Sequence, residues 1–445
     1  MAGGTFETYN KVRPGAYINF KSAAQPLNQV GTRGVATLPL AMNYGPNDTL
    51  IELTVEQLLD GSCESIIGCN IMEDESLVYQ QVLMDCYKVL LFRLDTAGTK
   101  ASLTLGALTA TAKYAGVSGN KISVAIVKNG DAFDVITSFN GLTRDIQTGT
   151  TVGDIESNDF VDFDGVAESL LTANAGGELE DGTNGVVNNS NYSKYFDLLK
   201  VAKWNCMGIP LENSTEVQSQ VKEFIEYMRE TVGSKVQAVL NNISANYEGI
   251  ISTVNQGYKS DQYEITPALF VARVTGMEAG CPINKSLTYY TFDDANEIIN
   301  QYNHDDIVNY LNQGKLLLSS RQDGVVVIEK DINTLHTFTT TKNYPFSKNR
   351  VIRTLDQINN DIRLLFEKSY LGKTDNNDDG RNVYKSDIID YLLKLQKMNT
   401  IQNFDGANDI SVVQGAHLDE VIVELNIQPV DAMEKMYMTV TVRES

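Results

Sequence analysis

Several features that mark common functional classes are scarce in this 445-residue sequence. No run of 18 or more apolar residues occurs, and the first residues lack the basic flank and apolar segment of an export signal. We therefore expect synthesis and folding in the cytoplasm. Acidic side chains outnumber basic ones, 57 to 36, which leaves a net charge of -21. Because binding to phosphate groups needs a basic surface, nucleic acid and a bare membrane are disfavoured as main partners.

Cysteine and histidine are too few and too dispersed to form a recognisable site. The five cysteines are never closer than six positions, which excludes a CxxC motif and favours free, mostly buried thiols. The three histidines, His304, His336 and His417, are far apart and form no HExxH pattern. Enzymes that rely on acid–base chemistry more often show such a cluster, so we expect no catalytic site, no metal and no cofactor.

One acidic segment partly matches a calcium-binding loop. Asp375, Asn377 and Asp379 occupy its positions 1, 3 and 5, but position 12, which should be a bidentate glutamate, is Ser386. The alternative is a polar loop between two helices, with Asp387 near a helix start. We favour the loop.

The length allows about three domains, and 42% of the residues are hydrophobic. Alternating apolar and polar residues at 122–126 and 133–136 are typical of half-exposed antiparallel strands. Residues 151–190 carry nine acidic and no basic side chains, which favours a solvated outer face. We expect an α+β multidomain protein with five segments: an N-terminal extended arm (1–30), a small α/β domain (31–95), an outward-facing β-rich insertion (96–182), a central α/β domain (183–340) and a C-terminal α+β inner domain with a terminal strand arm (341–445).

Apolar periodicity places several helices and strands. A helix is predicted at 215–231, because Val217, Val221, Phe224 and Met228 share one stripe after the capping signal of Asn213 and Ser214. Other predicted elements are a helix running into a strand within 73–94, strands at 235–240 and 315–318, helices at 351–370 and 386–395, and alternating terminal strands at 420–428 and 436–442.

Residues 342–373 contain seven basic against three acidic side chains. On a helical wheel, the apolar residues of the predicted helix form one stripe, and the basic side chains lie outside it. One interpretation is a solvated helix whose charges pair locally with Asp356, Asp361 and Glu367. The other is a cationic face directed at an acidic partner, formed by Arg350, Arg353, Arg363 and Lys368.

Several segments, in order, resemble the sheath protein of contractile phage tails, particularly the type of Gram-positive phages and defective prophages. They are MAGGTF at 1–6 with RPGAYI at 13–18, KYAGVSGNKI at 113–122, YEGII at 247–251, ARVTGMEAG at 272–280, INTL at 332–335, NRVIRTLD at 349–356 and the terminal strand pair. The glycine-rich segment at 176–182 departs from the family pattern, because it is longer than the usual Gly-Gly-x-Asp-Gly that precedes the central domain.

The resemblance implies a central sheath domain, rings (hexameric in this family) stacked around an inner tail tube, and contraction that drives the tube through a cell envelope. It implies partners in the tail tube, baseplate and tail-end proteins, and a place in a virion tail or tail-like particle assembled in the bacterial host. Neighbours would exchange terminal strands, and a terminal hairpin paired only within its own domain is the alternative. The expected linking residues are Tyr17, Ile18, Asn19, Phe20, Val421, Val423, Leu425, Ile427, Met438, Val440 and Val442. Rival functions are a self-assembling surface-layer or adhesin protein and a hydrolase with a β-rich binding domain.

Overall fold

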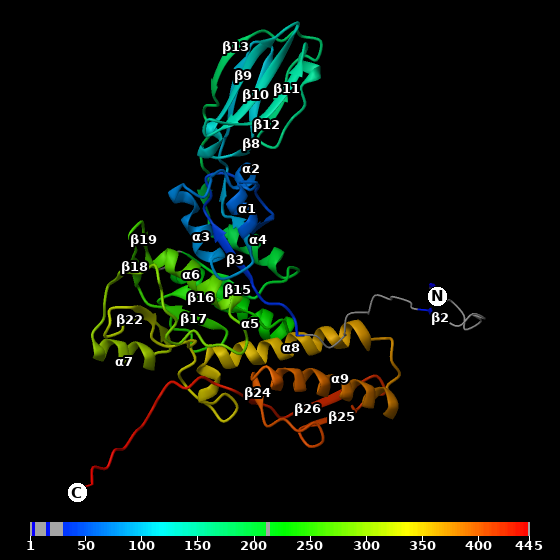
Figure 1. Cartoon of the computed structure of the whole chain (residues 1–445), viewed down its shortest axis with the longest axis vertical. Coiled ribbons are helices and arrows are strands. Elements are labelled where there is room, and N and C mark those ends of the chain that lie inside the picture. The colour runs from blue at the N-terminus through cyan, green and yellow to red at the C-terminus, as the bar shows by residue number, and fades with distance from the viewer. Residues whose placement is uncertain (1, 5–14, 18–29, 211–213, 444–445) are drawn as a thin grey trace. The chain divides into compact units, whose positions relative to one another are not determined.

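The computed structural model describes residues 2–4, 15–17, 30–210 and 214–443 (Figure 1). These residues form two compact units. The large unit comprises 32–360 and 429–443, and the small unit comprises 361–428 and the described residues before Thr32. The small unit therefore differs at both ends from the predicted C-terminal domain. In the described part of the chain, no helix is long and apolar enough to cross a membrane.

A seven-stranded sheet forms the centre of the large unit, in the order β21-β17-β16-β15-β3-β5-β4. Neighbouring strands are parallel, except that β4 is antiparallel to β5. Strands buried on both faces need nearly continuous apolar sequence, which β5 supplies. The bounds are β3 (Val35–Leu40), β4 (Leu50–Thr54), β5 (Lys88–Arg93), β15 (Cys206–Gly208), β16 (Gln237–Asn241), β17 (Ile250–Thr253) and β21 (Lys315–Leu316).

Residues 31–95 are not a separate small domain, which corrects the prediction. Strand β3 pairs with β15, Ala36 opposite Cys206, so this segment completes the central sheet. Local sequence patterns show that strands and helices exist, but pairing across a long insertion depends on tertiary contacts.

Helices cover both faces of this sheet. Leu90 and Phe92 of β5 pack in a core with α4 (Ser190–Leu199) and α5 (Thr215–Glu226), whereas Leu91 packs with α3 (Leu77–Leu83) and α6 (Pro267–Gly280). Helix α6 lies very close to α3 because Gly276 has no side chain, and a Cβ there would lie 2.0 Å from the Val82 carbonyl oxygen.

The helix predicted at 215–231 is confirmed. Its four stripe residues are buried, and the side chain of Ser214 accepts a hydrogen bond from the Val217 N–H. The α-helix ends at Glu226 and continues as a π-helical segment, η4 (Tyr227–Val232).

The β-rich insertion is confirmed as two sheets around one apolar core, in the orders β12-β8-β7 and β11-β10-β9-β13. Strand β6 (Asp95–Thr96) pairs with β14 (Val186–Val187), so the chain enters and leaves the insertion side by side. The alternation at 122–126 and 133–136 lies in β9 and β10. The bounds are β7 (Lys100–Leu105), β8 (Leu108–Ala115), β9 (Ile122–Asn129), β10 (Ala132–Phe139), β11 (Leu142–Gly149), β12 (Val161–Asp164) and β13 (Asn174–Glu178).

Smaller elements complete the large unit. They are α1 (Val55–Asp60), α2 (Glu64–Ile67), η1 (Asp74–Ser76), η2 (Val117–Lys121), η3 (Val152–Asp154), β18 (Gly257–Lys259), β19 (Glu264–Ile265), β20 (Glu297–Ile299), α7 (His304–Asn312), β22 (Leu318–Ser320), β23 (Val326–Ile328) and η5 (Tyr344–Ser347).

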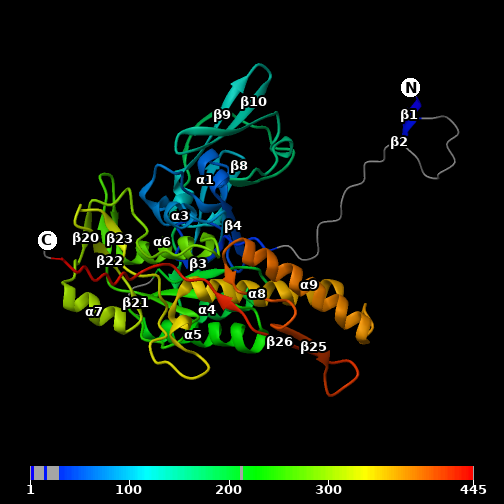
Figure 2. The ribbon, with the colours of Figure 1, turned by 60° about the horizontal axis from the view of Figure 1, so that its bottom comes forward.

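The small unit consists of helices and short strands. Helix α8 (Asn349–Ser369) passes from the large unit into the small unit after Asn360, and α9 (Asp378–Lys397) packs beside β25 (Figure 2). Both helices confirm predicted ones. The strands are β1 (Ala2–Gly4), parallel to β2 (Gly15–Tyr17), β24 (Ile401–Gln402), β25 (Ile410–Gln414), β26 (Val421–Leu425) and β27 (Gln428–Pro429).

Candidate assembly surfaces

The β25–β26 hairpin has an open edge. The strands pair antiparallel, with Val412 opposite Val423, and form a sheet of only two strands within the described residues. Of the predicted linking residues, Val421, Val423 and Leu425 lie in β26, and Ile427 follows it. In the described part of the chain, the outer edge of β26 therefore has no partner strand for its backbone N–H and C=O groups, a state that favours pairing with another chain.

The second predicted terminal strand does not form a strand in this chain. Residues 435–443, which we name the C-terminal arm, have no regular secondary structure and are exposed throughout. Met438, Val440 and Val442 are each at least 70% exposed. The alternating pattern suits a strand, but a strand needs a partner, and the described residues of the chain provide none for this segment.

The N-terminal candidates are only partly described. Tyr17 ends β2, where it lies opposite Gly4 of β1. Ile18, Asn19 and Phe20 lie outside the described residues.

The predicted cationic face is wrong for its first two members. Arg350 and Arg353 are buried, and Arg353 is 0% exposed. The guanidinium of Arg353 pairs with Glu278 of α6, and with Asp331 at 2.8 Å. The helical wheel failed because no residue of α8 between Asn349 and Asn360 is exposed, so residues outside its apolar stripe are buried too.

This buried cluster holds two carboxyl groups on one guanidinium. Burial raises the pKa of Glu278 to about 8, and the charge of Arg353 offsets only part of that effect. Burial also opposes ionisation of Asp331, but Arg353 and hydrogen bonds outweigh it and lower its pKa. Asn349 donates to both acids, at 3.1 Å to Glu278 and 2.9 Å to Asp331. Sequence reasoning missed this cluster, although a glutamate within the otherwise largely apolar α6 signals a buried ion pair.

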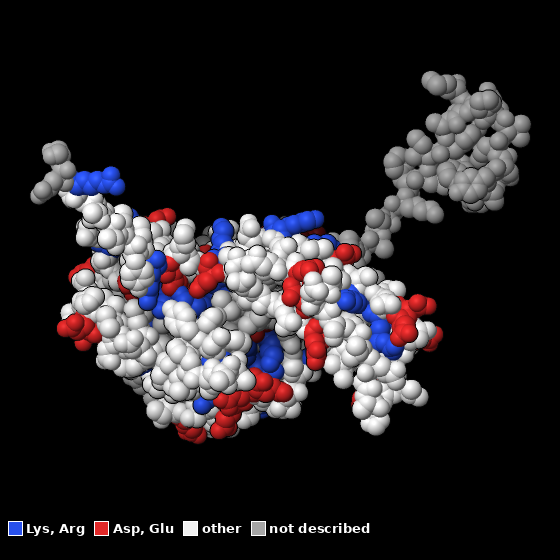
Figure 3. Space-filling view, turned by 90° about the horizontal axis from the view of Figure 1, so that it is seen from below, with Lys and Arg blue, Asp and Glu red and all other residues white. Residues whose placement is uncertain are grey.

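The other two basic candidates are exposed. Arg363 donates to Glu367 at 2.8 Å, one turn along α8, and Lys368 is exposed near the end of the helix. Lys/Arg and Asp/Glu surfaces are interspersed on the face drawn in Figure 3. Exposed pairs of this kind contribute little to stability.

The segment that resembles a calcium loop starts a helix. Asn377 is the N-cap of α9 and accepts a hydrogen bond from the Gly380 N–H at 2.8 Å. Asp379 lies in the first turn, where carboxylates favour the positive end of the helix dipole. Asp387 is not near a helix start as expected: it lies within α9 and accepts a hydrogen bond from Tyr370. No cluster of metal-binding side chains occurs among the residues described.

The cysteines have the character predicted for them. All five are free and buried. Burial raises the pKa of the Cys63 thiol to about 11. Such thiols are unreactive at neutral pH.

Comparisons with known proteins point to one family. Three domain models match consecutive segments: the phage tail sheath protein beta-sandwich domain at 95–184, the central domain at 185–334 and the phage tail sheath C-terminal domain at 341–443. The phage-like element PBSX protein XkdK of Bacillus subtilis (strain 168) is 32% identical over 99% of this chain and 100% of its own length. The tail sheath protein of Clostridium phage phiCD119 is 28% identical over 46% of this chain and 56% of its own length.

Solved structures agree. The sheath tail protein of Desulfitobacterium hafniense superposes with a TM-score of 0.82 at 36% identity, covering 96% of this chain and 99% of that protein. The sheath tail protein of Listeria innocua gives a TM-score of 0.80 at 30% identity, covering 93% and 96%. The contracted helical sheath of the anti-feeding prophage shares the fold at 10% identity, with a TM-score of 0.56 over 97% of this chain and 99% of that one. The chain therefore belongs to the phage tail sheath protein family, the self-assembling structural proteins of contractile tails and phage tail-like particles.

Proposed function

We propose that this chain assembles as stacked hexameric rings around an inner tail tube, and that contraction of the cylinder drives the tube through a host cell envelope. Neighbouring subunits exchange terminal strands. The partners are further copies of the chain, the tail tube protein, and the baseplate and tail-end proteins. Assembly takes place in the cytoplasm of the bacterial host.

The observation that carries the proposal is the match between an open strand edge and an exposed, alternating arm. The five residues of β26 leave one edge without a partner strand in the described chain, and each of the nine residues of the C-terminal arm is exposed. Met436, Met438, Val440 and Val442 alternate with polar or aromatic residues, so an added strand would present one apolar face. Adding a strand to an open edge uses backbone hydrogen bonds for affinity and side chains for specificity.

The free energy expected for each exchanged strand is sufficient to hold neighbouring subunits together in a ring. Each backbone hydrogen bond contributes about 0.5–1.5 kcal/mol net. Four or five such bonds, with burial of the exposed methionine and valine side chains, would hold each neighbour firmly. The contact resists pulling along the strand while domain surfaces elsewhere can rearrange during contraction.

Two further roles are part of the proposal. The β-sandwich insertion faces outward, which is supported by its nine acidic residues without any basic ones between 151 and 190. Arg363 and Lys368 contact the tail tube, which is supported by their exposure in an otherwise strongly acidic protein. Salt would screen such contacts, as suits a tube that must be released.

Electron microscopy of the purified protein tests strand exchange. Deletion of 436–445 removes only exposed residues among those described, so the variant should fold with unchanged circular dichroism but form no sheath tubes. Val440→Pro should also prevent tubes, because proline cannot donate to a ladder, and the matched Val440→Thr should assemble. Normal tubes from the deletion variant would overturn the proposal, and flat lattices from the intact protein would favour a surface layer.

Cysteine crosslinking locates the contact. Because the five native thiols are buried, introduced cysteines can be oxidised selectively. Val440→Cys combined with Val423→Cys should give a ladder of linked subunits in assembled protein on a non-reducing gel. Val440→Cys combined with Leu142→Cys, in the β-sandwich, should give none. The same ladder from both pairs would show that the links are nonspecific.

A further inference from the structure

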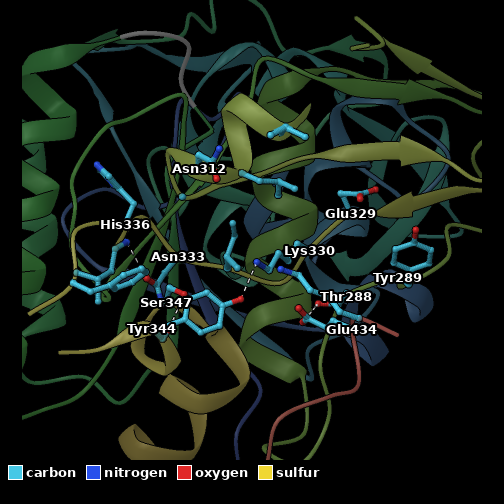
Figure 4. Close-up of a pocket in the computed structure, with 17 residues that line it drawn as sticks. Thr288, Tyr289, Asn312, Glu329, Lys330, Asn333, His336, Tyr344, Ser347 and Glu434 are labelled. Atoms are coloured by element: carbon cyan, nitrogen blue, oxygen red, sulfur yellow. Dashed lines mark hydrogen bonds between the residues drawn. The ribbon is translucent and has the colours of Figure 1, made fainter. Parts of the chain in front are cut away.

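The base of the C-terminal arm is held by side chains of the large unit. Lys348, which is only 2% exposed, forms an ion pair with Glu434, and its Nζ also lies 3.7 Å from an Asp431 oxygen. The Thr288 hydroxyl donates to the other oxygen of Glu434 at 2.9 Å (Figure 4). We name the contacts of Lys348 and Thr288 with Glu434 the arm clasp.

Thr288 connects the arm clasp to the buried ionic cluster around Arg353. Thr288 accepts a hydrogen bond from the Asp331 N–H at 2.9 Å, and Asp331 pairs with Arg353 of α8. A polar chain therefore joins the arm base to the framework of the large unit. Every residue from Lys435 to Arg443 is exposed.

The position of the clasp is unexpected from the order of the chain. The hairpin β25–β26 belongs to the small unit, which ends at Gln428, but the following residues belong to the large unit. Without the clasp, the segment 430–435, which follows β27, would be a flexible spacer of roughly 20 Å extended length. An arm on such a spacer would search a large volume, which lowers its effective concentration at a neighbour's strand edge.

We propose that Lys348 and Thr288 are positioning residues, which clamp Glu434 so that a strand donated to a neighbour pulls on the large unit. This inference rests on the proposed strand exchange. The clasp makes no contact with the neighbour: it sets where the arm begins and removes slack from the tether. Force on a donated strand then passes through Glu434 to Lys348 and α8.

The critical concentration for polymerisation tests the clasp. Glu434→Gln keeps the size of the side chain, and Lys348 retains Asp431 at 3.7 Å as a charged partner, so the fold should be retained. The critical concentration should rise about fivefold or more, and the tubes that form should break on dilution. Lys435→Gln, a matched charge change at the next, exposed position, should leave both unchanged. An unchanged critical concentration for Glu434→Gln would overturn the proposal.

Limited trypsin digestion of the monomer gives a second readout. Lys348→Met should speed cleavage after Lys435 at least tenfold, whereas cleavage after Arg321, in an exposed turn, should not change. Lys348→Arg keeps the cation and should retain slow cleavage. Equal cleavage rates in all three proteins would overturn the clasp. A separate experiment tests strand exchange itself: if the protein lacking 436–445 forms normal tubes, the proposed strand exchange is wrong.

Discussion

The β-sandwich insertion and the β25–β26 hairpin differ in how many strands pair with one another within the chain. The sandwich packs two sheets of three and four strands around a common core. The hairpin has two strands, with α9 beside β25. Because an isolated two-stranded sheet is at best marginally stable in water, the difference separates a domain that is complete in one chain from an element that, under the proposed strand exchange, a neighbour completes.

Two equally exposed aliphatic residues illustrate the difference. Val127 of β9 is 48% exposed and Ile422 of β26 is 47% exposed. The backbone of β9 is paired on both sides, with β10 and β13, whereas β26 pairs only with β25 among the described residues. Exposure alone therefore does not distinguish these two strands, whereas the pairing state of their backbones does.

The largest effect on folding is expected in the sandwich core. Phe139 is 1% exposed, and its ring centroid lies 5.5 Å from that of Phe160. Phe139→Ala should lower the free energy of unfolding of the sandwich by about 3–5 kcal/mol, because it leaves a cavity. Denaturant unfolding measures this loss, and tubes should still form below the transition. A loss under about 1 kcal/mol would show that this core does not stabilise the domain.

Excision of the sandwich should have an intermediate effect. Strands β6 and β14 pair where the insertion begins and ends, so a short Gly/Ser linker can replace residues 97–184. The remaining protein should lose about 1–2 kcal/mol of unfolding free energy, because partly buried pairs such as Arg144–Glu64 disappear. Electron microscopy should still show tubes. A folded variant that forms none would place essential assembly contacts on the sandwich.

A charge on the open edge should affect stability little and assembly strongly. Ile422→Lys should change the free energy of unfolding by less than about 1 kcal/mol, yet prevent tubes, since an edge lysine blocks strand addition. The matched Val127→Lys should assemble normally. If both variants form tubes, the edge of β26 is not a contact between subunits.

The smallest effect on stability is expected at the exposed end of α8. Reversing charge at Arg363 and Lys368 together should change the free energy of unfolding by less than about 0.5 kcal/mol. Tube-filled tails should become fewer, while empty sheath polymers form as before. Electron microscopy at low ionic strength counts both species. Unchanged tube filling would remove these residues from the tube contact.

Prediction from sequence succeeded where periodicity is local. The stripe of α5, the strands β9 and β10 and the two long C-terminal helices follow from side-chain spacing, because 3.6- and 2-residue periods place apolar groups on one face. The helical wheel of α8 failed at Arg353 because a wheel describes a single helix. It does not show how much of the surface of that helix is buried by the rest of the protein. The arm clasp could not be predicted from the sequence either, because Lys348 and Glu434 lie far apart in the chain.

The sequence by itself determined the family, the α+β composition, the β-rich insertion and the alternation of the C-terminal arm, all of which are written in local spacing or in ordered motifs. The tertiary structure alone decided that β3 joins the central sheet beside β15, that Arg353 is buried between two carboxyl groups, and that the arm begins from the large unit. The physical reason is the same in each case. These features depend on contacts between residues that lie far apart in the chain, and local sequence patterns do not show which distant residues meet in space.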